Sequence, residues 1–260
     1  MPLMSSANYI QIVPKLSPPE DIQDPYFEIP ITITNRGDES AYETKFSLIL
    51  PDGFTGQSIF YQKLEPKQEK KDIFRINISE DAIPGAYIVA LLTNYKDENQ
   101  YPFSSVNAQT IIYKTPTMNT ISGIMGNLEL EKEAATTNLK IMNRDEKAHD
   151  VKIKLILPDE LRADIVMLNI VLEPNKEQQI PITIEPAGAL PGSIYPITAI
   201  ASYTENNQHY ASLIRGVITI KQTTTSKLPF PVWLPPAILV SILGYLIYRK
   251  ITKNRKKKKR

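Results

Sequence analysis

Residues 46–52 read FSLILPD, and residues 153–159 read IKLILPD. Both segments carry an apolar run that ends in Leu-Ile-Leu-Pro-Asp, and they lie 107 positions apart. An apolar run that stops at Pro-Asp is typical of a strand that enters a turn. The recurrence of the same strand and turn suggests that the chain contains two copies of one unit.

Further matches support the duplication. They follow one order, with shifts of at most one residue: Asn35-Arg36 with Asn143-Arg144, Leu64-Glu65-Pro66 with Leu172-Glu173-Pro174, Ala82-Ile83-Pro84-Gly85 with Ala189-Leu190-Pro191-Gly192, and Tyr95 with Tyr203. A period this long indicates two copies of a whole domain, because solenoid repeats are much shorter.

Within each copy, apolar and polar residues alternate, as in 27–33 and 180–184. Strict alternation of β-branched and aromatic residues indicates strands with one buried face. Turn residues such as Pro51-Asp52-Gly53 separate these runs, and about seven short strands per copy are typical of a sandwich. The predicted fold is therefore all-β, with two tandem immunoglobulin-like β-sandwich domains followed by one C-terminal transmembrane α-helix.

The expected division of the chain follows these signals and the low-alternation stretches between them. It is an N-terminal segment 1–7, a first sandwich 8–114, a linker 115–125, a second sandwich 126–221, a polar stalk 222–229, a transmembrane helix 230–248 and a basic tail 249–260. Each copy holds a complete set of strands, so each sandwich is expected to fold on its own.

Charge is distributed unevenly along the chain. Nine of the 30 basic residues lie in 249–260, and the other 21 are outnumbered by 28 acidic residues. The part before the tail is therefore mildly acidic, which argues against nucleic-acid binding, since that needs a basic face. The chain has no cysteine, so disulfides, thiolate metal sites and a cysteine nucleophile are excluded.

Residues 230–248 read FPVWLPPAILVSILGYLIY and contain no charge. Nineteen residues in a helix just span a hydrocarbon core of about 30 Å. The residues expected at the membrane interface are Trp233, Tyr245, Tyr248, Arg249 and Lys250. The basic tail should remain cytoplasmic and attract anionic lipids, which leaves the β domains outside the cytoplasm in a single-pass protein of the cell membrane.

Export of the β domains requires a signal, and the N-terminal MPLMSSANYIQIVPKL has no apolar h-region. Either a signal peptide has been removed or left out, or the start is misassigned. The rival interpretation is a tail-anchored protein that faces the cytosol, which would require translocation of the basic tail.

The repeat unit resembles prokaryotic surface β-sandwich modules of the CARDB-like and NPCBM-associated kind. The residues that carry this resemblance are turn residues: Asn35-Arg36-Gly37, Leu50-Pro51-Asp52-Gly53, Leu64-Glu65-Pro66-Lys67 and Pro84-Gly85-Ala86-Tyr87, with their counterparts in the second copy. Both copies depart from the pattern at the third turn, where Lys67 or Asn175 stands in place of the usual Gly. The resemblance implies a surface location as spacer, adhesion module or accessory unit, and no particular ligand.

The residues that carry chemistry in enzymes are sparse. No nucleophile elbow, zinc-protease helix, phosphate loop or dinucleotide fingerprint is present. His149 and His209 have no His or Cys nearby in sequence and are expected to be exposed at strand edges or turns. The sequence therefore predicts a protein that is not an enzyme, with no cofactor and no metal set.

Three weaker signals remain open. Asp38, Glu39, Asp145, Glu146 and Asp150 offer oxygen ligands for weak calcium binding, without the spacing of a calcium loop. Arg36-Gly37-Asp38 spells an adhesion tripeptide but is better explained as a turn. Asn77-Ile78-Ser79 is a glycosylation sequon.

Aromatic residues gather near the last strands of each copy. Those that recur in register are expected to pack in the core: Tyr87, Tyr95, Tyr195 and Tyr203. Tyr101, Phe103 and Tyr210 lie beside the expected hairpin tips and are the candidates for contact with a partner.

Two functions fit these observations. The first is a non-catalytic, membrane-anchored extracytoplasmic scaffold or accessory subunit of a membrane protein assembly. The second is a cell-surface module for adhesion or for recognition of glycan or protein. The expected partners are membrane lipids, through the helix and tail, and one or more proteins of a membrane complex.

Overall fold

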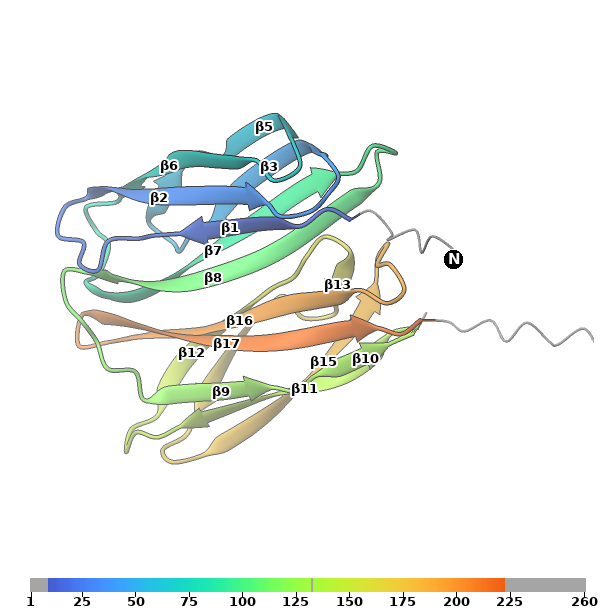
Figure 1. The fold of residues 1–260 in the computed structure, drawn as a ribbon. Helices are drawn as coiled ribbons and strands as arrows, with labels where there is room; N and C mark the ends of the chain where they lie inside the picture. Colours follow the sequence, from blue (N-terminus) through green and yellow to red (C-terminus); the bar gives the residue numbers. More distant parts are fainter. Residues whose placement is uncertain (1–8, 132, 223–260) are drawn as a thin grey trace, which may run out of the picture. The chain divides into compact units, whose positions relative to one another are not determined.

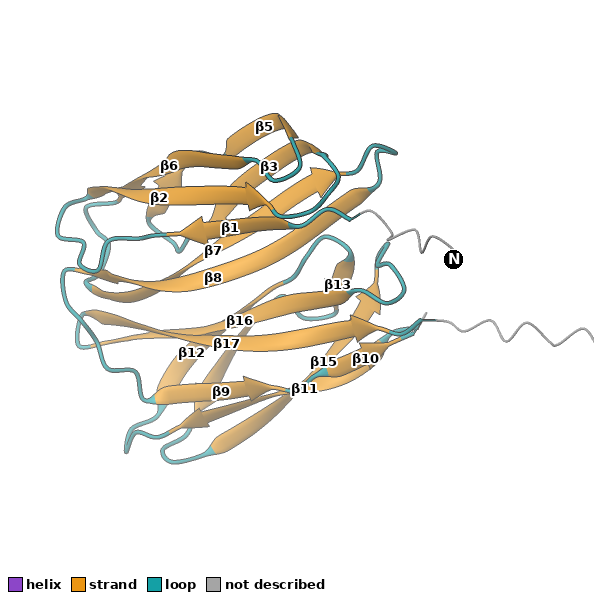
Figure 2. Cartoon of the chain, in the orientation of Figure 1, coloured by secondary structure: helices purple, strands orange, loops and turns teal. Residues whose placement is uncertain are grey.

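The computed structural model describes residues 9–131 and 133–222, and within them every regular element is a strand (Figures 1 and 2). The predicted all-β class is confirmed. The first copy contains β1 (Ile12–Leu16), β2 (Tyr26–Asn35), β3 (Ala41–Ile49), β4 (Phe54–Gly56), β5 (Ile59–Leu64), β6 (Glu69–Ile78), β7 (Gly85–Lys96) and β8 (Pro102–Tyr113).

The second copy has the same set with one added strand. It contains β9 (Ile121–Met125), β10 (Leu128–Leu130), β11 (Ala135–Asn143), β12 (His149–Ile156), β13 (Leu161–Ala163), β14 (Met167–Leu172), β15 (Glu177–Pro186), β16 (Ile194–Glu205) and β17 (Gln208–Ile220). The short β10 pairs parallel with β17. In the first copy, an isolated parallel bridge between Ile22 and Tyr113 takes its place.

The two copies are folded alike. One sheet of the first copy has the order β1-β2-β6-β4, and the corresponding sheet of the second has the order β9-β11-β15-β13. The opposing sheets run β5-β3-β7-β8 and β14-β12-β16-β17. Each pair of sheets encloses its own apolar core, so each copy is a β-sandwich.

Alternation along the strands produces these cores. In β2, Phe27, Ile29, Ile31 and Ile33 are buried, and the residues between them are exposed or half-buried. Each buried side chain of this size stabilises the fold by about 1.5–3 kcal/mol relative to an exposed one. Three of the four tyrosines expected in the core, Tyr87, Tyr195 and Tyr203, are buried, and Tyr95 packs against the first core at its edge.

A buried asparagine organises the same loop in each sandwich. The Asn35 amide donates to the carbonyls of Glu39 and Leu64, and its side-chain oxygen accepts the Gly37 N–H. Asn143 makes the equivalent bonds to Lys147, Leu172 and Asp145. A fully buried amide is stable only when its groups are bonded, which explains why Asn-Arg recurs as a landmark of the repeat.

Both copies adopt the same backbone conformation at the third turn. Lys67 and Asn175 have φ values of 60° and 53°. This left-handed conformation favours Gly, and Asn tolerates it better than most residues. The third turn of each copy therefore has a backbone that glycine adopts readily, although neither copy has glycine there.

The two sandwiches are joined by an apolar contact that lies outside both cores. Alternate residues of β7 point in opposite directions: Tyr87, Val89 and Leu91 enter the first core, while Ile88 and Ala90 face the second sandwich. The contact consists of buried Ile88, Ala90, Val106, Ala108, Ile156 and Ala211, with partly buried Ile49, Leu92, Ile200 and Leu213 around them. We call these ten residues the intersandwich cluster.

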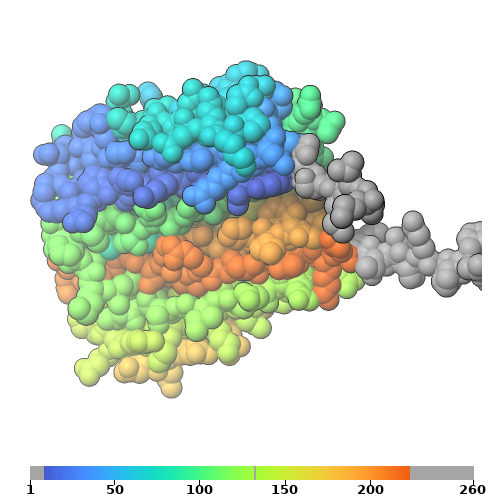
Figure 3. Space-filling model, viewed as in Figure 1, coloured from blue at the N-terminus to red at the C-terminus, as the bar shows by residue number. Residues whose placement is uncertain are grey.

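Along this contact, β8 lies against β17, and no gap is visible between them on the face shown in Figure 3. At one end the backbones themselves meet, where His209 of β17 pairs with Gly85 of β7. A Cβ on Gly85 would lie 2.0 Å from the His209 carbonyl oxygen, so this approach requires glycine. Through this pair the sheets of the two sandwiches become continuous.

The second sandwich begins earlier than expected. Residues Ile121–Met125, placed in the linker 115–125 by the sequence, form β9 and pair with β11. Residues 9–131 and 133–222 contain no helix long and apolar enough to cross a membrane. The predicted transmembrane helix 230–248, the basic tail 249–260 and most of the stalk 222–229 lie outside the described residues.

The intersandwich cluster leads to a prediction about coupling. Ala108→Glu places a carboxylate in the apolar contact, which should lower the free energy of unfolding of residues 9–222 by at least about 2 kcal/mol. We expect calorimetry to show one transition for the wild type and two for this variant, because the sandwiches lose their coupling. Asn107→Glu, at the exposed neighbouring position of β8, is the control and should behave as the wild type. Two transitions in the wild type would contradict the coupling.

Candidate functional site

The predicted contact residues Tyr101 and Phe103 lie between the two sandwiches. The Tyr101 hydroxyl donates to the Gly188 carbonyl of the second sandwich at 2.7 Å. Phe103 stacks on Tyr95 with a centroid separation of 5.3 Å and meets Tyr101 edge-to-face. These aromatic rings therefore already serve the contact within the chain, and their binding to a separate partner stays a prediction.

Next to these rings, the Glu160 carboxylate of the second sandwich is hydrogen-bonded to the first sandwich. Glu160 is 5% exposed, and it accepts hydrogen bonds from the backbone N–H and the hydroxyl of Ser104. Burial raises the pKa of Glu160 above its ordinary value, although the bonds from Ser104 oppose this shift. Asn94 adds a hydrogen bond to Asp159 at 2.9 Å. A polar rim of this kind fixes the orientation of the two sandwiches around the apolar cluster.

A cleft of about 420 Å³ also lies at the contact, lined by residues of both sandwiches. Its lining combines apolar side chains such as Ile88 and Ile200 with the ion pair between Lys152 and Asp52, whose atoms are 2.8 Å apart. This pair again joins the second sandwich to the first. Tyr95 and Phe103 line a further cleft of about 470 Å³ beside Glu160.

His209 is a structural residue of this contact, so the expectation of an exposed histidine is wrong. Its ring stacks on Tyr87 at 4.0 Å between centroids, and its Nδ1 lies 2.7 Å from the Ala86 carbonyl oxygen. Burial lowers the pKa of His209, which favours the neutral ring with Nδ1–H as the donor. Sequence reasoning misplaced it because Gly85, its partner across the contact, is more than 120 residues away.

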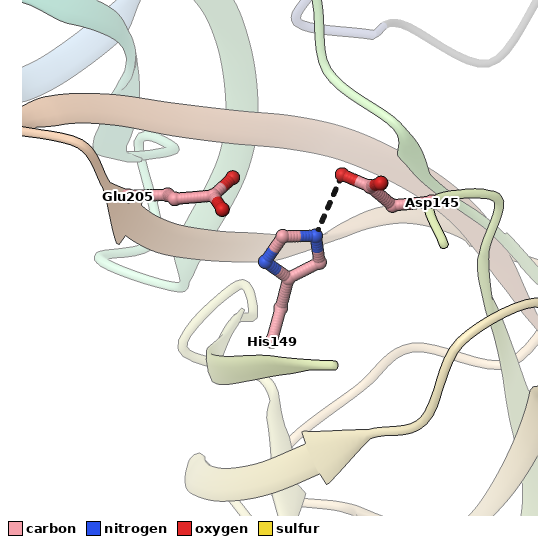
Figure 4. A group of neighbouring side chains, drawn as sticks. All are labelled: Asp145, His149 and Glu205. Carbon is pink, nitrogen blue, oxygen red and sulfur yellow. Dashed lines mark hydrogen bonds and ion pairs between the residues drawn. The ribbon is translucent and has the colours of Figure 1, made fainter. Parts of the chain in front are cut away.

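His149 is buried, against expectation, whereas His209 is half-buried, and His149 lies in a group of titratable side chains (Figure 4). Its Nε2 is 3.0 Å from Asp145 Oδ2, and ligand atoms of Asp145, His149 and Glu205 all lie within 4.8 Å of one another. Hydrogen bonding to His149 lowers the pKa of Asp145. Lys147 pairs with Glu205 at 2.9 Å. We call Asp145, His149 and Glu205 the histidine cluster.

Tyr210, the third predicted contact residue, belongs to the surroundings of this cluster. It stacks on Tyr203 at 4.7 Å, and Tyr203 in turn packs against His149 at 4.3 Å. The structure therefore separates the three predicted aromatic residues. Tyr101 and Phe103 lie in the intersandwich contact, and Tyr210 lies in the second sandwich near the histidine cluster.

The acidic residues considered for calcium are divided between the sandwiches. Asp38 and Glu39 belong to the first, where Asp38 Oδ1 accepts the Tyr9 N–H. Among residues 9–131 and 133–222, the group of ligand residues brought together is the histidine cluster, which shares only Asp145 with the earlier set. The five acidic residues that offered oxygen ligands for calcium therefore do not lie together in one group.

The adhesion tripeptide is a packed turn. A Cβ at Gly37 would lie 2.2 Å from the Tyr9 carbonyl oxygen, so glycine is needed where the N-terminal segment crosses the loop. The sequon residue Asn77 is exposed on β6. The membrane-interface residues Trp233, Tyr245, Tyr248, Arg249 and Lys250 lie outside the described residues.

One feature of the sequence does indicate the contact. Residues 85–92 read GAYIVALL, a run with no polar residue, whereas β2 alternates strictly. A continuous apolar run is typical of a strand that is buried on both faces. The histidine cluster gave no comparable signal, because Glu205 is 56 positions from His149.

A substitution at Tyr101 can test how much its hydrogen bond to Gly188 contributes to stability. Tyr101→Phe removes the hydroxyl that bonds the Gly188 carbonyl and should lower the free energy of unfolding by about 0.5–1.5 kcal/mol. Tyr9→Phe is the control, because Tyr9 is exposed and its hydroxyl has no hydrogen-bond partner among the described residues. We expect urea unfolding of residues 9–222 to separate the two variants. Equal stabilities would show that the bond to Gly188 contributes nothing in solution.

The raised pKa of Glu160 predicts that the stability of the folded protein depends on pH. Since its pKa is raised in the folded protein, the folded protein holds this proton more tightly than the unfolded chain. This contribution to stability is fully present below the ordinary glutamate pKa and is lost as pH rises through the raised pKa. Glu160→Gln keeps an acceptor for Ser104 and removes the titration. The stability of the wild type relative to this variant should therefore fall as pH rises from the ordinary glutamate pKa through the raised pKa; parallel curves would contradict the assignment.

No family model matches this chain, and no curated protein is similar to it in sequence. Solved structures that resemble it include trypsin-activated alpha-2-macroglobulin from Escherichia coli, at 10% identity and a TM-score of 0.34 over 81% of this chain and 18% of that one. Others are the YadV chaperone, at 10% identity and a TM-score of 0.32 over 78% and 98%, and the periplasmic chaperone SfaE, at 12% and 0.33 over 80% and 100%. The chain thus spans less than a fifth of the macroglobulin. With TM-scores below 0.5, these resemblances carry no argument about function.

Proposed function

We propose that the protein is a non-catalytic scaffold or accessory subunit of a membrane protein assembly. Its two β-sandwiches stand outside the cytoplasm, and residues 230–248 anchor them in the membrane, with the basic tail on the cytoplasmic side. The uncharged segment and the nine basic residues after it support this orientation. The turn pattern shared with CARDB-like and NPCBM-associated modules supports the extracytoplasmic location.

The observation that carries the proposal is the intersandwich cluster. Two sandwiches on a free linker would present their surfaces independently of each other. Here apolar side chains from β7, β8, β12 and β17 are buried together, and Glu160 and Lys152 bond across the rim. Such a contact holds the loops of both sandwiches in a fixed relation, which is what a scaffold needs in order to bind one partner through both domains.

A second candidate function is recognition of a glycan or protein at the cell surface. The two clefts at the contact favour it, because volumes of about 420 and 470 Å³ fall within the usual range for ligand sites. The larger cleft is lined by Tyr95, Phe103 and Tyr195, and aromatic rings are common in binding surfaces. The scaffold is preferred because the rings of Tyr95 and Phe103 are already stacked on each other.

Co-purification of partner chains tests the proposed scaffold role. The full-length protein, with an epitope on its tail, is solubilised in mild detergent, and co-purifying chains are identified by mass spectrometry. We expect a stoichiometric membrane partner with the wild type and with Asn107→Glu. Ala108→Glu should lose it, because the sandwiches are no longer held together. A lone chain that binds glycans would favour the second function.

Proteolysis of intact cells tests the orientation. Added protease should remove the β domains and spare the tail epitope, which becomes accessible only after the membrane is permeabilised. Protected β domains with a cleaved tail would establish the opposite orientation and overturn the extracytoplasmic role.

A further inference from the structure

His149 occupies a position at which the fold does not require histidine. It pairs with Leu172 across β12 and β14, as Ala41 pairs with Leu64 across β3 and β5. Ala41 and His149 are therefore equivalent residues of the two sandwiches, and both are buried. Since alanine satisfies this position in the first sandwich, packing alone does not explain the imidazole in the second.

A second member of the cluster is specific to the second sandwich in the same way. Asp145 follows the buried Asn143 by two residues, just as Gly37 follows Asn35, and both donate their N–H to that asparagine. The loop backbone is thus common to the two sandwiches, while the carboxylate is added only in the second. Two residues of the cluster thus differ from their equivalents in the first sandwich, and the ligand atoms of all three lie close together. We propose that Asp145, His149 and Glu205 bind a divalent transition-metal ion of the zinc class.

The ligand atoms come from three separate elements. Asp145 lies in the loop between β11 and β12, His149 begins β12 and Glu205 ends β16. The 3.0 Å between Nε2 and Oδ2 is close to the roughly 3.3 Å that separates two ligands of a tetrahedral zinc ion with bonds of about 2.0 Å. Glu205 lies within 4.8 Å of the others, so a small movement of its side chain completes a three-ligand set.

The ring of His149 points into this cluster. Its side chain is only 4% exposed, and Figure 4 shows its second nitrogen on the side of Glu205. That nitrogen, Nδ1, has no hydrogen-bond partner within residues 9–131 and 133–222 and is not among their fully buried unpaired atoms, so water reaches it. Nε2, the nitrogen that faces Asp145, is the ligand atom that we assign to this buried imidazole, with the carboxylate of Glu205 close by.

The ligands are held in position by their surroundings. Asn143 fixes the loop that carries Asp145, and the Tyr203 ring packs against the imidazole. Tyr203 is itself covered by Tyr210 on its other side. These contacts restrict the His149 ring before any ion is bound, which reduces the entropy lost on coordination.

Lys147 is the competing cation. Its ammonium group pairs with Glu205 at 2.9 Å, while its side chain is 63% exposed. An exposed lysine gains little from such a pair and moves readily. A metal ion can therefore take the Glu205 oxygen while Lys147 turns to solvent, and water completes the coordination.

The ligand set selects the class of ion. One imidazole and two carboxylates suit zinc and neighbouring transition metals, whereas calcium requires six to eight oxygen ligands. The cluster supplies too few oxygens for calcium. Zinc is therefore the appropriate probe, with calcium and magnesium as comparison ions.

The test is zinc binding to the full-length protein in detergent after treatment with a chelator. We expect calorimetry to give one zinc ion per chain, with calcium and magnesium unable to displace it. His149→Ala, which copies the first sandwich, and Glu205→Gln should each weaken binding by about tenfold or more. His209→Asn is the matched control and should bind as the wild type.

A cobalt spectrum provides a second readout that does not depend on stability. Cobalt in the wild type should show the intense visible bands of a four-coordinate site, and these should vanish in Glu205→Gln. Failure of the folded wild type to bind zinc would overturn the proposal. Zinc binding that is unchanged in both His149→Ala and Glu205→Gln would also overturn it, because the ion would then sit elsewhere on the surface.

Discussion

The two apolar faces of β7 determine how the two sandwiches pack against each other. A strand buried on one face needs one core, but β7 has Val89 and Leu91 in the first core and Ile88 and Ala90 on the opposite side. Leaving that second face in water would forfeit the free energy of burying it and expose an adhesive surface. The second sandwich covers it, and the clefts, the cross-sandwich hydrogen bonds and the Gly85–His209 pair all lie around that contact.

The sequence predicts the parts of the fold that depend on local patterns. Alternation in residues such as Phe27 and Ile29 identifies strands, and the recurrence of Asn35 at Asn143 reflects a buried amide that each copy needs. The contact between the sandwiches was missed because it pairs side chains from distant segments, such as Ala108 and Ala211. The surroundings of the histidines could not be predicted for the same reason, since half-buried His209 stacks on Tyr87 and buried His149 packs against Tyr203, and no local pattern connects these residues.

Comparison of the two copies separates what the fold needs from what one copy has added. Positions that match in both, such as the buried asparagines and the left-handed third turn, are requirements of the sandwich. Equivalent positions at which the two copies differ, such as Ala41 and His149, are not fixed by the fold, so a side chain there is available for binding. In a scaffold, this arrangement lets one sandwich gain a binding site while the contact between the two remains unchanged.

The contacts between the two sandwiches should hold them in one fixed arrangement. Because the chain has no cysteine, Lys71→Cys and Gln179→Cys place one spin label on an exposed strand position of each sandwich, and pulsed electron paramagnetic resonance gives the distribution of distances between them. We expect a single narrow distribution in the full-length protein. A broad distribution, as expected for two domains on a flexible linker, would contradict it.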